Sequence, residues 1–312
     1  MLDKPTPAAA ITAWTVQPLA LAAVVLLAAG YVYGLRRSSY RVPRWRVGVF
    51  ALGLLLLVWA SCGFGQVYGR SLYWVWTSQT LMLWLGVPTI VLLGHPVQLA
   101  QGLSSPDGWL TRVLHSRFVR LIENPLVGPA LVPILSFALF FGPLPEWTVR
   151  SDGVDWGLQI VLLLIGALMV LPLAGLEEEA SSLAVGLSLA IGAFELVLDA
   201  VPGIVLRLYN SLVSDWFVYR AQWPWSPHPM RDQKLAGNIL WTVAEVIDLP
   251  FLVLVFLRWL RADARDAAEV DAVLEAERAA RIAIEPDAPD ADRDAPWWLT
   301  DPRFQNRFPH SG

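Results

Sequence analysis

Four carboxylates lie within two apolar stretches in the second half of the chain, where a charged group would have little water around it. Glu195 and Asp199 are four residues apart, and Glu245 and Asp248 are three apart, so each pair would share one face of a helix. Ionisable side chains at such positions usually face the interior of a helical bundle. We therefore expect two neighbouring helices to present these carboxylates to each other.

This arrangement is typical of a proton path, a cation site or a polar cavity, with Arg207 or Lys234 as counter-charges. A structural role fits equally well, because protonated carboxylates that bond to the backbone or to glutamines also hold membrane helices together. Both readings remain open from the residues alone. The predicted intramembrane polar cluster consists of Gln79, Gln159, Glu195, Asp199, Glu245 and Asp248.

The elements that would hold these groups are seven apolar stretches, each long enough as a helix to cross a hydrocarbon core of about 30 Å. They are Val16–Leu35, Val47–Gln66, Leu72–Gly94, Pro125–Leu144, Trp156–Leu176, Leu183–Leu208 and Leu235–Trp259. The composition agrees, with 55% hydrophobic and only 16% charged residues. Because the stretches are continuous rather than alternating, they exclude a β-barrel. The sequence predicts an all-α, polytopic membrane protein with seven transmembrane helices.

The connecting loops predict the orientation of the helices. The loop after the first stretch carries five arginines, namely Arg36, Arg37, Arg41, Arg44 and Arg46. Positive loops mark the cytoplasmic side, so we expect the N-terminus outside and the C-terminus in the cytoplasm. Residues 1–260 would form the transmembrane domain. Residues 261–284, which have good helix propensity, would form a cytoplasmic helical extension, and the Asp- and Pro-rich residues 285–312 a disordered cytoplasmic tail.

Residues typical of metal binding or nucleophilic catalysis are scarce. The single cysteine, Cys62, excludes a disulfide framework. The four histidines lie outside the spanning cores and lack helical spacing to one another; they are His95, His115, His228 and His310. Soft metals prefer clustered cysteine, methionine or histidine. We therefore expect no catalytic residue, no cofactor and no metal site, a lipid bilayer as surroundings, and no nucleic-acid partner.

One segment carries a resemblance to a known family. Residues 232–241 begin with Asp232 and Gln233 and continue to Gly237 and Trp241. They resemble the DQ-x-x-(A/G)-G-x-x-x-W signature of the CtaG family, the multi-spanning cytochrome c oxidase assembly factors, and most closely its actinobacterial members. Further agreement is found at Gln79, Pro88, Gly94, Pro96, Gly166 and Pro172. The resemblance implies seven helices with an outside N-terminus, a multi-pass protein of the bacterial plasma membrane, and oxidase subunits or other membrane assembly factors as partners.

The chain departs from this family at its histidines. Trp76 and Thr80 stand where the third-helix motif has two histidines, and Gln159 stands where the fifth helix has another. No histidine occurs near Phe140–Leu144, where the family has a WHLP-like motif. Those histidines are the copper ligands that the resemblance implies. The fold is therefore expected to carry over, and the imidazole copper site is not.

Two hypotheses from different classes follow. The first is a CtaG-like membrane protein that assists or scaffolds oxidase assembly without copper at the usual site. The alternative is a small ion or solute transporter, or a channel, that uses the intramembrane carboxylates. A membrane enzyme is disfavoured because no nucleophile or metal cluster is visible.

Overall fold

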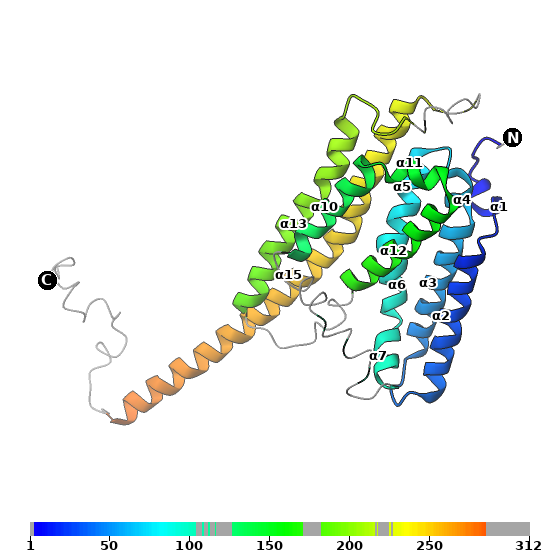
Figure 1. Ribbon diagram of the computed structural model, residues 1–312. Helices are drawn as coiled ribbons and strands as arrows, with labels where there is room; N and C mark the ends of the chain where they lie inside the picture. The colour runs from blue at the N-terminus through cyan, green and yellow to red at the C-terminus, as the bar shows by residue number, and fades with distance from the viewer. Residues whose placement is uncertain are drawn as a thin grey trace.

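All regular structure in the described part of the chain is helical, with no strand. The computed structural model describes residues 3–103, 108, 112, 116, 127–170, 182–215, 217, 225 and 227–284. The helices form a bundle from which one very long helix projects (Figure 1). The predicted tail, residues 285–312, lies outside the described residues, as do His115, His310 and Pro172.

The helices follow the chain in a simple order. The N-terminal half contains α1 (Ala9–Thr12), α2 (Pro18–Arg37), α3 (Arg44–Cys62), α4 (Phe64–Tyr68), α5 (Tyr73–Leu81), the π-helical turn η1 (Met82–Gly86), α6 (Val87–Leu93) and α7 (Pro96–Gln101). The second half contains α10 (Val127–Phe141), α11 (Leu144–Arg150), α12 (Asp152–Val170), α13 (Ser182–Leu208) and α15 (Pro229–Ile284). With 56 residues, α15 is about 80 Å long.

Several of these helices can cross a membrane. Five stretches are long and apolar enough, namely Pro18–Arg37, Arg44–Tyr68, Tyr73–Leu93, Asp152–Val170 and Leu189–Leu208. A sixth crossing results if Leu131–Phe141 and Leu144–Arg150, which meet at a bend of 53°, count as one. The prediction of an all-helical, multi-pass membrane protein is therefore confirmed for the described residues. The seventh predicted stretch, Leu235–Trp259, is not among these crossings and lies within α15.

The third spanning helix is interrupted by η1, and the reason is local. Pro88 has no N–H for the carbonyl of Trp84, four residues earlier, and the N–H of Val87 bonds to Met82, five residues back. Helix α12 crosses at this point: a Cβ on Gly166 would lie 1.7 Å from the Trp84 carbonyl oxygen. Only glycine fits here, and this contact sets α12 against η1 and α6.

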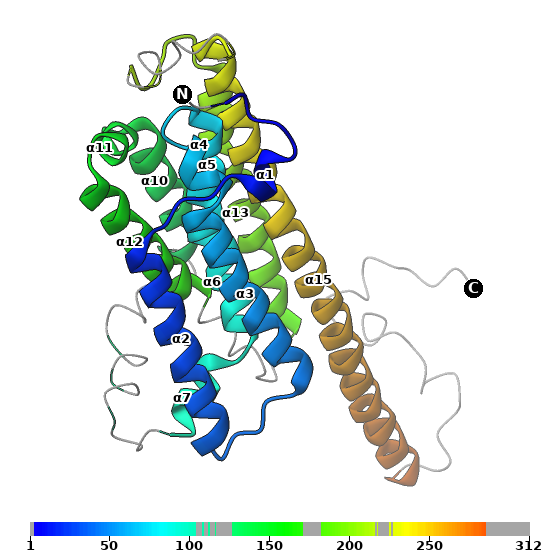
Figure 2. The same cartoon turned by 90° about the vertical axis from the view of Figure 1, so that its right-hand side faces the viewer.

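Helices α13 and α15 pack closely as an antiparallel pair. A Cβ on Gly203 would lie 2.5 Å from the backbone nitrogen of Trp241, and one on Gly237 would lie 2.6 Å from that of Arg207. The two glycines therefore bring the helix backbones together near one end of the bundle. That end also holds α1, α4 and α11, whereas the α2–α3 turn, α7 and the C-terminal part of α15 lie at the other (Figures 1 and 2).

Candidate functional site

Buried polar side chains join three helices at the end of the bundle where α4 and α11 lie. Gln66 comes from α4, Gln79 from α5, and Asp155 and Gln159 from α12; all four are buried. Gln66 Nε2 donates to Asp155 Oδ2 at 2.7 Å, and Gln79 Nε2 donates to Gln66 Oε1 at 2.7 Å. Gln159 Nε2 donates to both Gln66 Oε1 (3.0 Å) and Asp155 Oδ2 (3.2 Å). We call these four residues the amide network.

Close backbone approach places the network between its helices. A Cβ on Gly65 would lie 3.2 Å from Gln79 Cβ, and one on Gly69 would lie 3.0 Å from Gln79 Oε1. The two glycines thus let α4 and the following turn close over Gln79. Asp155 and Gln159 are four residues apart, so they share the face of α12 that meets Gln66.

The network satisfies most of its own hydrogen-bonding needs. The second N–H of Gln79 goes to the carbonyl of Ala60 at 3.0 Å, and both N–H groups of Gln159 are used within the network. Asp155 accepts two amide bonds at one oxygen. Buried polar groups that are paired in this way stabilise helix contacts, whereas unpaired ones are costly. The arrangement therefore fastens α4, α5 and α12 together.

The donor set does not fit copper. The network offers amide and carboxylate oxygens, whereas copper in proteins is held by imidazole, thiolate or thioether groups. Across the described residues, no group of three or more histidine, cysteine, aspartate or glutamate side chains is placed to hold a metal ion. Cys62 is buried, and His95 and His228 lie apart from the network, at the start of α7 and just before α15.

Charged residues lie next to the amide network, in the turn after α4, in α11 and at the start of α12; we call them the rim. Arg70 pairs with Asp152, one helical turn before Asp155, and Arg150 pairs with Glu146 within α11. Both pairs are partly or largely exposed. Exposed ion pairs of this kind add little stability, so the charges mark the surface end of α12 rather than hold it in place.

The positions at which the resemblance implies histidines are occupied by packed side chains. Trp76 is buried, and its Nε1 donates to Thr148 Oγ1 at 3.0 Å, which links α5 to α11. Thr80 is buried as well. Gln159 belongs to the amide network. The space that imidazoles would need is therefore filled by an indole, a hydroxyl and an amide.

The signature residues at the start of α15 hold neighbouring segments in place. Asp232 Oδ2 accepts the backbone N–H of Tyr73 at 2.8 Å, and Asp232 Oδ1 that of Trp74 at 3.0 Å, so its carboxylate caps the first turn of α5. Burial raises the pKa of the Asp232 carboxyl, and the two N–H bonds offset part of that effect. Gln233 bonds through its amide to the backbone of Ser211 and Val213, at 2.9 Å each.

Gly237 and Trp241, the other two signature residues, lie one and two turns further along α15. Gly237 is one of the two glycines at which α13 and α15 approach closely, as described above. Trp241 packs at the same crossing, against Gly203, and its Nε1 donates to Glu245 Oε1 at 2.5 Å. The signature that carries the family resemblance therefore builds the fold around α5 and α13.

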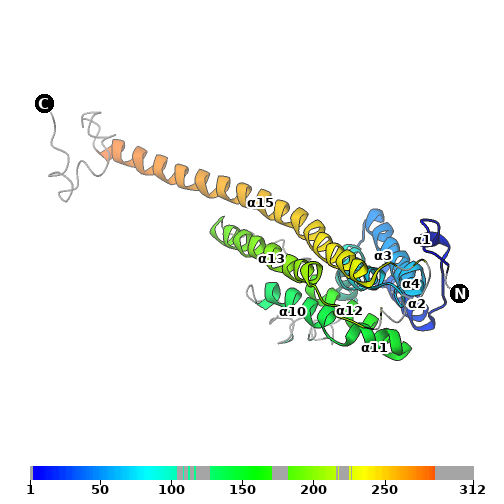
Figure 3. The same ribbon diagram turned by 90° about the horizontal axis from the view of Figure 1, so that it is seen from above.

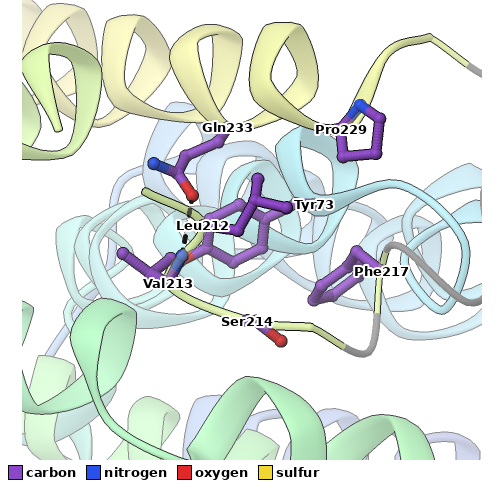
Figure 4. Close-up of a pocket in the computed structure, with 7 residues that line it drawn as sticks. All are labelled: Tyr73, Leu212, Val213, Ser214, Phe217, Pro229 and Gln233. Atoms are coloured by element: carbon purple, nitrogen blue, oxygen red, sulfur yellow. Dashed lines mark hydrogen bonds between the residues drawn. The ribbon is translucent and has the colours of Figure 1, made fainter. Parts of the chain in front are cut away.

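Gln233 also borders the small hollow shown in Figure 4. Its lining is Tyr73, Leu212, Val213, Ser214, Phe217, Pro229 and Gln233. The Tyr73 hydroxyl donates to the Phe140 carbonyl at 2.7 Å, and Gln233 Oε1 accepts the backbone N–H of Val213. The polar groups of both residues are thus already engaged, so the hollow offers mainly apolar surface.

The six predicted cluster residues do not form one cluster. Gln79 and Gln159 meet through Gln66. Asp199 is buried and Glu195 is half-buried on α13, which packs chiefly against α15 and α10. Glu245 is exposed on the outer side of α15. The side chain of Asp248 lies outside the described residues. The expected facing of all four carboxylates therefore stays a prediction, although Glu245 itself is directed away from the bundle.

Sequence reasoning missed two members of the amide network. Asp155 lies four residues before Gln159, a spacing that puts both on one helix face, but it comes just before the predicted stretch Trp156–Leu176. Gln66 ended a predicted apolar stretch and gave no signal of its own. The i, i+4 relation of Asp155 to Gln159 could have identified the first of them.

Comparison with known proteins agrees with this architecture. A model of the cytochrome c oxidase caa3 assembly factor family matches residues 29–262. An uncharacterized protein of Mycobacterium bovis is 30% identical over 288 residues, which cover 86% of this chain and 42% of that protein. One of Mycobacterium leprae is 28% identical over 279 residues, 83% of this chain and 41% of that protein. The chain thus spans less than half the length of these relatives, and no solved structure matches it. It belongs to the cytochrome c oxidase caa3 assembly factor family.

Proposed function

We propose that this chain assists the assembly of a cytochrome c oxidase as a membrane scaffold, without holding copper at the family's histidine positions. The amide network supports the proposal most directly. It occupies the region where imidazoles would be expected, and its amides bond to one another and to Asp155. An arrangement of this kind fixes helices; it has no donor set for handing over a soft metal.

We propose seven crossings, with the N-terminus outside and the C-terminus in the cytoplasm of a bacterial cell. The stretch Leu235–Trp259 of α15 runs antiparallel to α13 and would be the seventh. The arginine-rich α2–α3 turn lies at the same end as the C-terminal part of α15, so positive loops gather at that end. Residues 261–284 would then extend α15 into the cytoplasm. Fusion of a reporter active on only one side to either terminus tests this topology.

The transporter or channel alternative has less support. It requires carboxylates of α13 and α15 to face one another along a path. Glu245, however, is exposed on the outer side of α15, bonded to Trp241 of the same helix. An enzymatic role has no observation in its favour.

The proposed role is tested by deleting the gene and measuring assembled oxidase spectroscopically in membranes. We expect a lower level of assembled oxidase, and co-purification of oxidase subunits with the tagged full chain. Unchanged oxidase together with no subunit on the tagged protein would contradict the proposal.

A copper-dependent role is separated from scaffolding by a matched pair of variants in the deletion strain. Gln159→Glu keeps the size of the side chain but removes the amide donors, and Asp152→Asn changes only the exposed rim. We expect the first to lower oxidase assembly through loss of folded protein, irrespective of added copper, and the second to have little effect. Rescue of Gln159→Glu by copper would contradict a structural role for the network.

A further inference from the structure

Helix α15 has an outer face that no described helix covers. Figure 3 shows α15 beyond its first turns along one edge of the bundle, with α13 and α10 on its other side. The exposed residues recur every three or four positions, which is the spacing of a single helix face. They are Thr242, Glu245, Val246, Leu249, Val253, Phe256, Leu257 and Leu260. All but Thr242 and Glu245 are apolar, as expected of a face turned towards lipid.

Glu245 is the exception on this face. Trp241 Nε1 donates to one of its oxygens from the same helix, and no hydrogen bond or ion pair joins Glu245 to another helix in the described part of the chain. A carboxylate that faces acyl chains is unfavourable, and ionisable residues within membranes almost always meet a protein partner or a water-filled cavity.

The level of Glu245 in the bundle follows from the packing of α13 on α15. Gly203 lies against Trp241, and Gly192 lies against the side chain of Leu252. Between these two contacts, Glu245 falls opposite the region of Asp199, which is the middle of the apolar stretch Leu189–Leu208. With α15 as the proposed seventh crossing, on which this inference rests, the carboxylate of Glu245 lies near the centre of the membrane, too deep to be reached by the headgroups.

A second copy of this chain could not supply the missing counter-charge. Among the residues that the structure describes, arginines, lysines and histidines lie at or beyond the ends of the apolar spans. Pairing of two α15 faces would bring Glu245 against apolar residues or against another Glu245. Charge complementarity instead favours a basic side chain from a different polypeptide.

We propose that the outer face of α15 around Glu245 docks a transmembrane helix of another protein, one that presents an arginine, lysine or histidine to Glu245 at mid-membrane. The apolar residues on either side of Glu245 would pack against this helix, while the charge pair fixes its depth and register. This inference goes beyond the proposed function, since it holds whichever polypeptide carries the helix.

Photo-crosslinking of the full chain in native membranes tests the docking face. A photoreactive residue is placed at Leu249, one turn from Glu245 and 54% exposed, and as a control at Leu26, mid-way along α2 and 72% exposed. We expect a discrete protein adduct from Leu249 only. Sequencing of the adduct should give a membrane-spanning peptide of another polypeptide that contains a basic residue.

The variant Glu245→Gln then tests the charge pair. We expect it to reduce the Leu249 adduct about threefold or more, the size of an average interhelical polar contact in a membrane, while the purified variant unfolds as the wild type does. A self-adduct, an adduct with lipid alone, a peptide without a basic residue, or an adduct that Glu245→Gln leaves unchanged would each overturn the proposal. Failure to find oxidase subunits with the tagged chain would count against the proposed function, but it would leave the proposed docking face of α15 standing.

Discussion

The two polar regions of this bundle are built in opposite ways. In the amide network, four side chains from three helices use their hydrogen-bonding groups on one another and are shielded from the surroundings. On the outer face of α15, Glu245 has a partner on its own helix and is exposed. The first region therefore contributes to holding the bundle together, and the second is suited to contact with something outside it.

Residue type alone therefore does not determine the role of a polar residue within a membrane span. Gln159 and Glu245 were predicted to belong to one cluster because of their residue types. What separates them is whether the neighbouring helices offer partners. Substitutions in the amide network should change the stability of the folded protein. Substitutions of Glu245 should change its association with another protein, so mutation can distinguish the two regions.

The largest effect is expected where α12 is set against η1 and α6. Gly166→Val places a side chain where even a Cβ would lie 1.7 Å from the Trp84 carbonyl oxygen. We expect a loss of more than about 3 kcal/mol in unfolding free energy, or failure to accumulate, because the backbones must separate. Gly157→Val on the same helix is the control, since a Cβ there has no neighbour within 4 Å. Equal yields and unfolding curves for both variants would show that the crossing is not as close as described.

The next largest effect is expected for a substitution within the amide network. Asp155→Leu removes the acceptor for Gln66 and Gln159 and leaves buried amide donors unpaired, so we expect destabilisation by about 2 kcal/mol. Detergent-solubilised protein can be followed by tryptophan fluorescence during denaturation. Asp152→Asn, at the exposed rim, should change stability by less than about 1 kcal/mol. Equal stability of the two variants would contradict a stabilising role of the amide network.

A substitution of Glu245 on the outer face of α15 should leave the unfolding free energy nearly unchanged. Glu245→Leu removes an exposed carboxylate whose described bond is to its own helix, so the unfolding free energy of the purified protein should change by less than about 0.5 kcal/mol. The same denaturation assay measures it beside Asp155→Leu. A loss as large as that of Asp155→Leu would mean that Glu245 is part of the bundle core and would remove the contrast between the two regions.

The smallest effect is a pH dependence at the cap of α5. Burial raises the pKa of Asp232 in the folded state above its ordinary value. The folded state is therefore favoured by protonation: this contribution is fully present below about pH 4, the unfolded value, and is lost as the pH rises through the folded pKa. Unfolding of the wild type and of Asp232→Asn at several pH values should show the wild type gaining stability relative to the variant towards acid pH. A difference that is constant with pH contradicts the assignment.

Much of the fold could be predicted because long apolar stretches leave few alternatives to spanning helices. The run from Leu72 to Gly94, for example, became α5, η1 and α6 with nearly the same ends. The π-helical turn within it depends on Pro88 and on the approach of Gly166 from a helix some eighty residues away, and sequence spacing does not reveal such an approach.

The site was less predictable. Gln79 and Gln159 were identified as polar groups within spans, but their link through Gln66 depends on how α4 continues α3 after the break at Gly63. The outward direction of Glu245 could not be predicted, because the segment around it is apolar on all sides and its pattern does not show which face will pack. The resemblance identified Asp232 and Gln233 as signature residues, and only the contacts across the bundle show that they cap α5 and hold the loop before α15.

The copper content of the purified full chain tests the central claim most directly. Protein isolated from copper-supplemented cells should contain substoichiometric copper by elemental analysis, and Gln79→Ala or Gln159→Ala should leave that amount unchanged. Copper bound in a stoichiometric amount, and lost from either variant while the protein remains folded, would show that the buried amides belong to a metal site and would contradict the account.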